Sequence, residues 1–362
     1  MKSYKNSVLF VIPDQYGYSA GYTYYCKYLT KFGYKVGVVC LDAGKPKRQL
    51  LYNETVYYVK LNNVISYRLE LLKTIYKVKN GYNNIVLKCF PGVSIFSAVL
   101  LGKRTWIDIR TGSVRRKKLH RTIENLLIKI ESLFFRRIFI LSLPLAKELS
   151  LPSKKVVLLP LGADEISKKT KTYTDSMRLL YIGTLGNIGG RNIHECVEGF
   201  AKFYNENKDK LELHFDIIGD GRDFCKNKVI DAIEKNQLSQ VVTYHGYLSH
   251  DEAVCFFDKC NVGVSYIPMT QFFENQPPTK TFEYVLSGLV CLATNTAANK
   301  ELIFDTNGVL HDDNPEAFYQ ALNIVYKNRH LYNYSSIKSS LHQFHWEQIV
   351  QNSMEKEFNV NR

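Results

Sequence analysis

The sequence predicts an α/β protein made of two doubly wound, Rossmann-like domains in series. Short apolar runs alternate with helical patterns through the first half, and a second alternating series begins near residue 176. Strands that are continuous apolar runs are typical of parallel sheets covered by helices on both faces. A chain of 362 residues is long enough for two domains, each with its own core.

The first series consists of short strands rich in Val, Ile, Leu and Phe, several of them separated by helices. The strands are expected at residues 8–12, 36–41, 56–61, 85–90, 106–109 and 138–142. The helices are expected at residues 22–32, 67–79 and 119–135. This alternation indicates a mainly parallel sheet.

The second series follows a polar, lysine-rich segment, 166–176, which is expected to be a linker. Its strands are expected at 179–182, 213–218, 241–244, 262–266 and 290–293. Its helices are expected at 192–207, 224–236, 250–260, 280–287 and 315–328, and a final helix at 344–358. The expected domains are 1–166 and 167–343, with a helical tail at 344–362. Two such sheets in series predict a central cleft where ligands bind.

Composition is that of an ordinary globular protein without a low-complexity tract. No stretch approaches the roughly 18–20 apolar residues of a membrane-spanning helix. The polar start of the chain indicates that no signal peptide is present. The eight cysteines lack zinc-type spacing and are expected to be reduced thiols of a cytoplasmic protein.

The two halves of the chain differ strongly in net charge. Residues 1–170 carry 30 Lys and Arg against 10 Asp and Glu, whereas residues 171–362 carry 18 against 24. The net charges are therefore +20 and −6, which indicates that the first half faces an anionic partner. Nucleic acid, an anionic membrane surface and a phosphorylated substrate are the candidates.

The strongest amphipathic pattern lies at residues 113–137. Apolar side chains recur there at helical spacing, at Leu119, Ile123, Leu126, Leu127, Ile130, Leu133 and Phe134. Basic residues surround this stripe, with a cluster from Arg115 to Arg121. Such a helix lies either on an anionic bilayer or against a domain core. We expect the stripe to lie in the core and the basic cluster to contact lipid phosphates.

Residues 277–285 (PPTKTFEYV) predict a helix whose first turn binds phosphate. Proline suits a first helical turn, and Thr279 is expected to cap it. Unpaired N–H groups attract phosphate there, and Lys280 adds a full positive charge. Glu283 shares the face of Lys280 and can accept hydrogen bonds from a ribose diol. The alternative is an ordinary helix in which Lys280 and Glu283 form a surface ion pair.

Three glycine-containing loops follow predicted strands. Residues 183–191 (GTLGNIGGR) allow close approach to a phosphate, which Arg191 would clamp, or form a plain turn with a solvated arginine. Residues 219–221 form a second such turn, which alone is weak evidence for a site. The loop 13–21, with Gly17 and Gly21, is equally suited to approaching a ligand or to being a simple connection. No P-loop, zinc, kinase, nucleophile-elbow or D-x-D motif is present.

In order, these segments resemble the family 4 retaining glycosyltransferases of the GT-B fold. The stretches that carry the resemblance are RLLYIGTL at 178–185, FDIIGDG at 215–221, VTYHGYL at 242–248, CNVGVSYIP at 260–268 and PTKTFEYVLSG at 278–288. Weaker likenesses are LLPLGAD at 158–164 and FHWE at 344–347. The resemblance implies that the C-terminal helix crosses back onto the first domain.

The resemblance implies a nucleotide-sugar donor in the second domain and an acceptor on the first. By position, Glu283 looks like the ribose-binding carboxylate of the family's E-x7-E pair. Lys280 and Arg191 look like the cations on the donor diphosphate, so that no metal or other cofactor is needed. Gly183, Thr184 and Tyr247 lie in matching stretches and are further candidates for donor contact, and Gly17 and Gly21 are candidates on the opposite wall.

This sequence departs from the family pattern at two positions. The first glutamate of the pair falls on Asn275, with Glu274 beside it, so either residue is a candidate for contact with the donor sugar. Thr184 stands where the family carries an arginine, which leaves Arg191 to contact the phosphate. Asp108 and Arg110, in the stretch WIDIR, resemble an Asp-x-Arg element near the sugar site, with burial in the strand as an equal alternative.

The resulting interpretation is a metal-independent hexosyl- or related glycosyltransferase in surface polysaccharide or glycoconjugate synthesis. It would transfer a sugar, with retention, from a UDP-, GDP- or similar nucleotide sugar to a lipid-linked or oligosaccharide acceptor. We expect it to be cytoplasmic and peripheral at the inner face of the membrane, and not to bind nucleic acid. A sugar-nucleotide epimerase of the same fold and a non-catalytic nucleotide- or membrane-binding scaffold are the alternatives.

Overall fold

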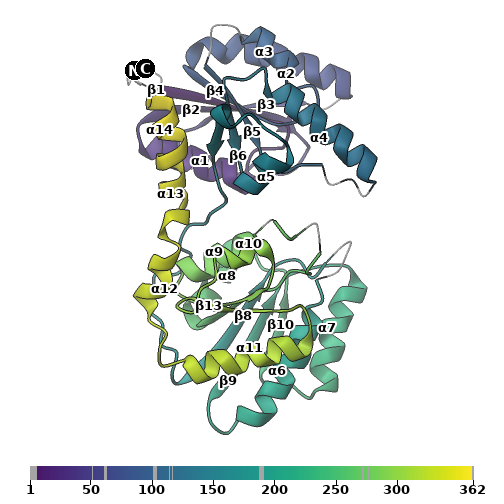
Figure 1. The fold of residues 1–362 in the computed structure, drawn as a ribbon, viewed down its shortest axis with the longest axis vertical. Coiled ribbons are helices and arrows are strands. Elements are labelled where there is room, and N and C mark those ends of the chain that lie inside the picture. The colour runs from purple at the N-terminus through teal and green to yellow at the C-terminus, as the bar shows by residue number, and fades with distance from the viewer. Residues whose placement is uncertain are drawn as a thin grey trace. The chain divides into compact units, whose positions relative to one another are not determined.

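The chain folds into two compact units, Met1–Leu161 together with Trp346–Arg362, and Gly162–His345. The structure is a computed structural model, drawn in Figure 1. It describes residues 6–50, 52–60, 63–100, 104–113, 115, 117–186, 191–270, 273–275 and 277–360. The predicted boundaries at 166/167 and 343/344 lie a few residues from these divisions. None of the helices in the described ranges is both long enough and apolar enough to span a bilayer.

The first unit contains a seven-stranded sheet in which every neighbouring pair is parallel. Its strands run in the order β3-β2-β1-β4-β5-β6-β7. They are β1 Asn6–Ile12, β2 Tyr34–Asp42, β3 Thr55–Lys60, β4 Asn84–Lys88, β5 Arg104–Ile109, β6 Arg137–Ile140 and β7 Val156–Leu158. The helices are α1 Ala20–Lys31, α2 Val64–Val78, α3 Ile95–Val99, α4 Lys118–Ser132 and α5 Leu143–Glu148. Strand β7 was not among the predicted strands.

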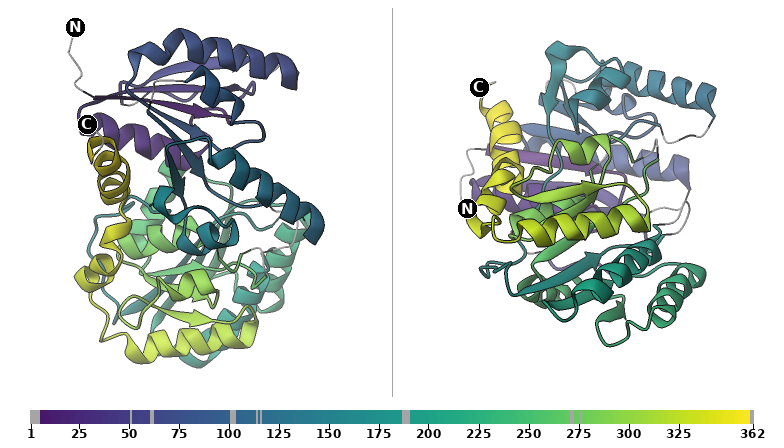
Figure 2. Two further views of the ribbon diagram at one scale, coloured as in Figure 1. Left: turned by 45° about the horizontal axis from the view of Figure 1, so that its top comes forward. Right: turned by 60° about the horizontal axis from the view of Figure 1, so that its bottom comes forward.

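Strand β1 lies inside this sheet, between β2 and β4, and is buried on both faces. Val8, Phe10 and Ile12 belong to the core on one face, whereas Leu9 and Val11 belong to the core on the other. This alternation follows from the two-residue period of a strand, and it explains why the whole run is apolar. Figure 2 shows helices on both faces of each sheet.

The C-terminal segment packs on the first unit, as the resemblance implied. It consists of α13 Trp346–Ile349, a π-helical stretch Val350–Glu355 and α14 Lys356–Val360. The Trp346 ring stacks on Tyr24 with centroids 5.4 Å apart, and Phe358 meets Trp106 edge-on at 4.9 Å. Ser353 Oγ donates to the Leu158 carbonyl at 2.7 Å. These contacts join the last residues of the chain to the first sheet.

The second unit contains a six-stranded parallel sheet in the order β10-β9-β8-β11-β12-β13. Its strands are β8 Ser176–Ile182, β9 Glu212–Ile218, β10 Val242–Gly246, β11 Val262–Ser265, β12 Val290–Thr294 and β13 Gly308–His311. Its helices are α6 Ile193–Asn207, α7 Asp223–Lys235, α8 His250–Lys259, α9 Thr279–Leu286, α10 Ala297–Lys300, α11 Pro315–Asn328 and α12 Tyr334–Ser340. Only β13 was not predicted among these strands. Both sheets are doubly wound, which confirms the predicted fold class.

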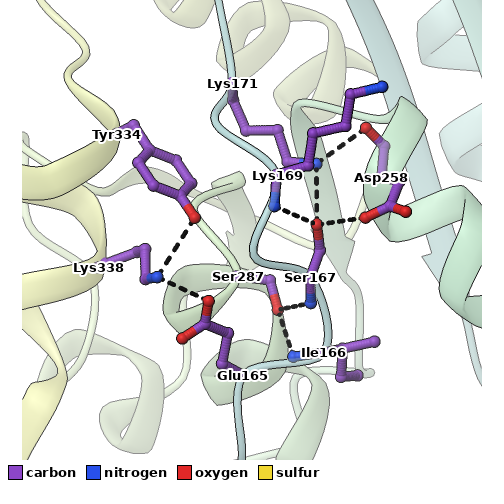
Figure 3. A network of polar contacts seen from close by, with 9 residues as sticks. All are labelled: Glu165, Ile166, Ser167, Lys169, Lys171, Asp258, Ser287, Tyr334 and Lys338. Carbon is purple, nitrogen blue, oxygen red and sulfur yellow. Dashed lines mark hydrogen bonds and ion pairs between the residues drawn. The ribbon is translucent and has the colours of Figure 1, made fainter.

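The segment expected to be a linker is held on the second unit (Figure 3). Ser287 Oγ accepts hydrogen bonds from the N–H groups of Ile166 and Ser167, at 2.9 and 3.3 Å. Lys171 is 6% exposed, and its ammonium group donates to Ser167 Oγ and to the carbonyl oxygens of Phe257 and Asp258. The polar residues of this segment therefore form hydrogen bonds within the second unit, and the segment is not a free linker.

The apolar stripe of α4 is exposed, so its predicted place in the core is wrong. Its seven members are between 44% and 70% exposed, whereas Ile128 packs against the core and Ser132 is fully buried. Helical periodicity shows that a helix is amphipathic, but it does not say whether the apolar face meets protein or lipid. Here the helix contacts its own unit through a narrower face, and the broad apolar face points away from it.

Candidate functional site

The helix α9 begins at Thr279, and Pro278 is its extended N-cap residue. No side chain caps its first turn, so the predicted capping by Thr279 is wrong: Thr279 lies inside the helix and leaves the N–H groups of the first turn without a side-chain acceptor. At the other end, Gly288 has a φ of +77°, and a Cβ there would lie 2.3 Å from the Tyr334 ring. The left-handed backbone conformation and the close approach of the Tyr334 ring both require glycine at this position.

Lys280 places a buried cation at the first turn of α9. The residue is 5% exposed, and its Nζ makes no hydrogen bond within the described part of the chain. It lies 4.0 Å from the centroid of the Tyr181 ring, which gives a cation–π contact. Burial, and then the positive charge of Arg191, lower the pKa of Lys280 well below its usual value. A buried ammonium group without a hydrogen-bond acceptor indicates a site prepared for an anion.

Gly183 brings the glycine-rich loop to this cation. A Cβ on Gly183 would lie 3.2 Å from Arg191 Nη1, 3.3 Å from Lys280 Nζ and 3.3 Å from Tyr181 Oη. The end of β8, the start of α6 and the start of α9 therefore meet at one point. Residues 187–190 of the predicted loop lie outside the described ranges. Tyr181 was not among the predicted site residues, although its position at the end of the strand that leads into the glycine-rich loop could have indicated it.

The glycine turn at residues 219–221 packs against the loop that begins at Gly183. A Cβ on Gly219 would lie 1.8 Å from the carbonyl oxygen of Gly183, so only glycine permits this approach. Gly183 N–H donates to the Ile218 carbonyl at 3.0 Å, and Leu185 N–H donates to the Asp220 carbonyl at 2.9 Å. The turn at 219–221 thus joins the ends of β8 and β9 and fixes the backbone around Gly183.

Glu283 lies one turn along α9 from Lys280 and is half-buried. Burial raises the pKa of its carboxyl group to about 7, and Lys280 opposes this rise. No hydrogen bond or ion pair to the Glu283 side chain occurs within the described ranges. Because Lys280 is buried and is not bridged to Glu283, the alternative of a surface ion pair does not hold.

Glu274 and Asn275 have different environments. Glu274 Oε1 accepts a hydrogen bond from the Ala297 N–H at 3.0 Å, and its carbonyl accepts one from the Ala298 N–H at 2.9 Å. Glu274 thus binds the first turn of α10, where a negative charge is stabilised. Asn275 is exposed.

The other predicted donor contacts, Thr184 and Tyr247, are both exposed. Thr184 Oγ1 accepts a hydrogen bond from the Gly186 N–H at 3.2 Å, within the glycine loop. Tyr247 is 75% exposed in the loop after β10, and within the described ranges it makes no hydrogen bond or cation–π contact with Lys280.

In the first unit, Asp108 and Arg110 form a buried cluster. Arg110 Nε lies between the two carboxylate oxygens of Asp108, 2.9 Å from Oδ1 and 3.0 Å from Oδ2, and Tyr22 Oη donates to Oδ2 at 2.6 Å. Burial raises the pKa of Asp108 to about 7 and lowers that of Arg110 to about 10. Tyr22 was not predicted, and no local motif indicates it because 86 positions separate it from Asp108.

Gly17 and Gly21 lie near protein groups in the same unit. Gly17 has a φ of +87°, and a Cβ there would lie 2.7 Å from the side chain of Arg48. Gly21 is inside α1, where a Cβ would lie 3.4 Å from Tyr25 Oη. The close approach at Gly17 is thus to a side chain of the same unit.

Comparison with known proteins agrees with this architecture. Residues 176–328, within the second unit, match the family model described as Glycosyl transferases group 1. None of the curated proteins matches the chain.

Solved structures resemble the chain over almost its whole length. A glycosyltransferase from Rickettsia africae has a TM-score of 0.74 at 12% identity, covering 99% of this chain and 100% of its own. Anabaena HepE in complex with UDP has a TM-score of 0.71 at 11% identity, with 98% and 100% covered. The lipopolysaccharide outer core galactosyltransferase WaaB has a TM-score of 0.69 at 14% identity, with 97% and 99% covered. The chain thus has the GT-B fold of glycosyltransferases.

Proposed function

We propose that this protein is a glycosyltransferase that takes a sugar, with retention, from a nucleotide-diphosphate donor. The observation that carries the proposal is the buried Nζ of Lys280, which has no hydrogen-bond acceptor in the described chain and lies beside Gly183 and Arg191. A diphosphate supplies the acceptors that this ammonium group lacks. The match of residues 176–328 to the glycosyl transferases supports this choice over other anions.

The arrangement fits a reaction in which the nucleotide diphosphate leaves. As the bond between the sugar carbon and the phosphate oxygen breaks, negative charge develops on the diphosphate. Lys280, Arg191 and the free N–H groups of α9 stabilise that charge, so the proposed reaction requires no divalent ion. Glu283 would accept hydrogen bonds from the ribose diol.

The donor sugar would contact the residues that precede α9. Glu274 is held at the N-terminus of α10, whereas Asn275 is exposed and carries both a donor and an acceptor. We therefore assign the sugar contact to Asn275 and a positioning role to Glu274.

The proposed acceptor is a lipid-linked glycan used in surface polysaccharide or glycoconjugate synthesis, reached from an anionic membrane surface. The support is the net charge of +20 in residues 1–170 and the exposed apolar stripe of α4. Lys118 and Arg121 lie in the first turn of α4, where the helix dipole disfavours positive charge and no side chain caps the end. Anionic lipid would relieve this repulsion. Arg115 pairs with Glu124 at 2.9 Å, and Arg116 lies outside the described residues.

A nucleotide screen and a product analysis test the proposal. Because Anabaena HepE binds UDP, UDP is tested first, followed by GDP, ADP and CMP. The diphosphate of the donor is expected to raise the melting temperature, since a ligand of the folded state stabilises it by mass action. NMR of the product should show the anomeric configuration of the donor. Absence of stabilisation by every nucleotide would contradict the proposal.

A further inference from the structure

The amine of Lys280 is buried beside a second basic group. Its side chain lies against the Tyr181 ring, with Nζ 4.0 Å from the ring centroid, and Nζ has no hydrogen-bond partner in the described ranges. Arg191 Nη1 and Lys280 Nζ both lie within 3.3 Å of the position that a Cβ on Gly183 would occupy. A proton on Lys280 therefore places two positive charges close together and away from water.

The other titratable groups that face Lys280 do little to balance these charges. They come from four elements: Tyr181 on β8, Cys196 on α6, Glu283 on α9 and Cys291 on β12. Burial raises the pKa of both thiols and raises that of the Tyr181 hydroxyl to about 12, so these three groups are neutral at physiological pH. Glu283 is the acid of this set, and burial raises its pKa to about 7.

The free site therefore opposes a charge on Lys280. Burial, followed by the charge of Arg191, lowers the pKa of Lys280 well below its usual value. Keeping the unpaired ammonium group costs free energy, and releasing the proton also costs, because a solvated lysine keeps its proton up to about pH 10. A diphosphate reverses both causes, since its oxygens accept hydrogen bonds from Nζ and its charge balances Arg191.

We propose that a nucleotide diphosphate binds together with a proton, which passes from the solvent to Nζ of Lys280 as the phosphate oxygens reach it. The free site holds a neutral amine, and the occupied site holds an ammonium group. Because each binding event consumes a proton, nucleotide affinity falls as the pH rises through the alkaline range, approaching about tenfold per pH unit. This inference rests on the proposed function and adds the regulation of its site by pH.

Calorimetric titration with UDP at pH 8, or with the diphosphate that the nucleotide screen selects, counts the protons. The titration is run in Tris and in HEPES, which release a proton with different enthalpies, so the difference in observed binding enthalpy gives the number taken up. At pH 8 the terminal phosphate, with a second pKa of about 6, has lost its last proton, and Glu283 is mostly ionised. We therefore expect the wild type to take up about one proton per bound diphosphate, all of it on Lys280.

Two methionine variants assign the proton to a residue. Lys280→Met should bind the diphosphate more weakly and take up no proton. Lys171→Met is the matched control, because Lys171 is also deeply buried, at 6% exposure, but donates hydrogen bonds to the carbonyl oxygens of Phe257 and Asp258. It should take up the same number of protons as the wild type.

Equal binding enthalpies of the wild type in the two buffers, with the diphosphate bound, would overturn this inference and leave the proposed function standing. Undiminished proton uptake by Lys280→Met would also overturn it, because another group would then be the one that titrates. If no nucleotide diphosphate binds at all, the proposed function fails and this inference fails with it.

Discussion

Replacing Lys280 with methionine should stabilise the protein while weakening its binding of a nucleotide diphosphate. Lys280 and Lys171 are buried to the same extent, at 5% and 6% exposure, but of the two only Lys171 has hydrogen-bond acceptors among the residues that the structure describes. Methionine keeps the length of Lys280 and removes the cost of holding an unpaired ammonium group away from water. Replacing buried charges with apolar residues stabilises proteins by about 1–4 kcal/mol, and the lost cation–π contact with Tyr181 offsets about 1 kcal/mol.

The expected net gain of about 0–3 kcal/mol corresponds to a rise in melting temperature of up to about 12 °C for a domain of this size. Differential scanning calorimetry without nucleotide measures it. Lys171→Met is the matched control, and it should lower the melting temperature because the carbonyls of Phe257 and Asp258 lose their donor. A Lys280→Met variant that is less stable than the wild type without nucleotide would refute the reasoning.

Three further outcomes follow from the same contacts. The unliganded protein should lose stability as the pH rises from about 4.5 to about 7, because the carboxyl groups of Glu283 and Asp108 hold their protons over this range in the folded state but not in the unfolded state. Glu283→Gln should make that slope shallower in pH-dependent urea denaturation, with the contribution of Asp108 remaining, and an unchanged slope would contradict the raised pKa of Glu283. Gly219→Ala should cost about 1–3 kcal/mol and weaken nucleotide binding, since its Cβ would lie 1.8 Å from the Gly183 carbonyl; calorimetry with an unshifted transition would count against this packing. Leu126→Gln should lower binding to anionic liposomes about tenfold in sedimentation, with Leu69→Gln unchanged, and equal sedimentation of both would argue against α4 as the membrane contact.

The sequence was most informative where structure is local. The start of α9 within residues 277–285 follows from the proline pair, and the apolar run of β1 follows from burial on both faces. Lys280 and Arg191 were predicted to serve one site, and Gly183 does lie beside both. The order of the glycine loops along the doubly wound sheets was enough to predict that Lys280 and Arg191 lie at one site, because the carboxyl ends of parallel strands meet at one edge of the sheet.

The predictions failed where a residue's environment depends on distant parts of the chain. The stripe of α4 has the same periodicity whether it faces a core or a membrane, and only the packing of Ile128 and Ser132 decides which face is inside. The hydrogen bond from Tyr22 to Asp108 joins α1 to β5, and no local pattern encodes it. Short strands such as Gly308–His311 lack enough residues for a periodic signal.

The central claim is that the second unit holds a nucleotide diphosphate on Lys280 and Arg191. The most direct test is calorimetric titration of wild type and Lys280→Met with UDP and with uridine, or with whichever diphosphate and nucleoside pair the screen selects. The account predicts that the wild type prefers the diphosphate, and that this preference falls about 10- to 150-fold in the variant, as expected for a lost charge-assisted hydrogen bond. Equal binding of diphosphate and nucleoside by the wild type, or an undiminished preference in the variant, would contradict it.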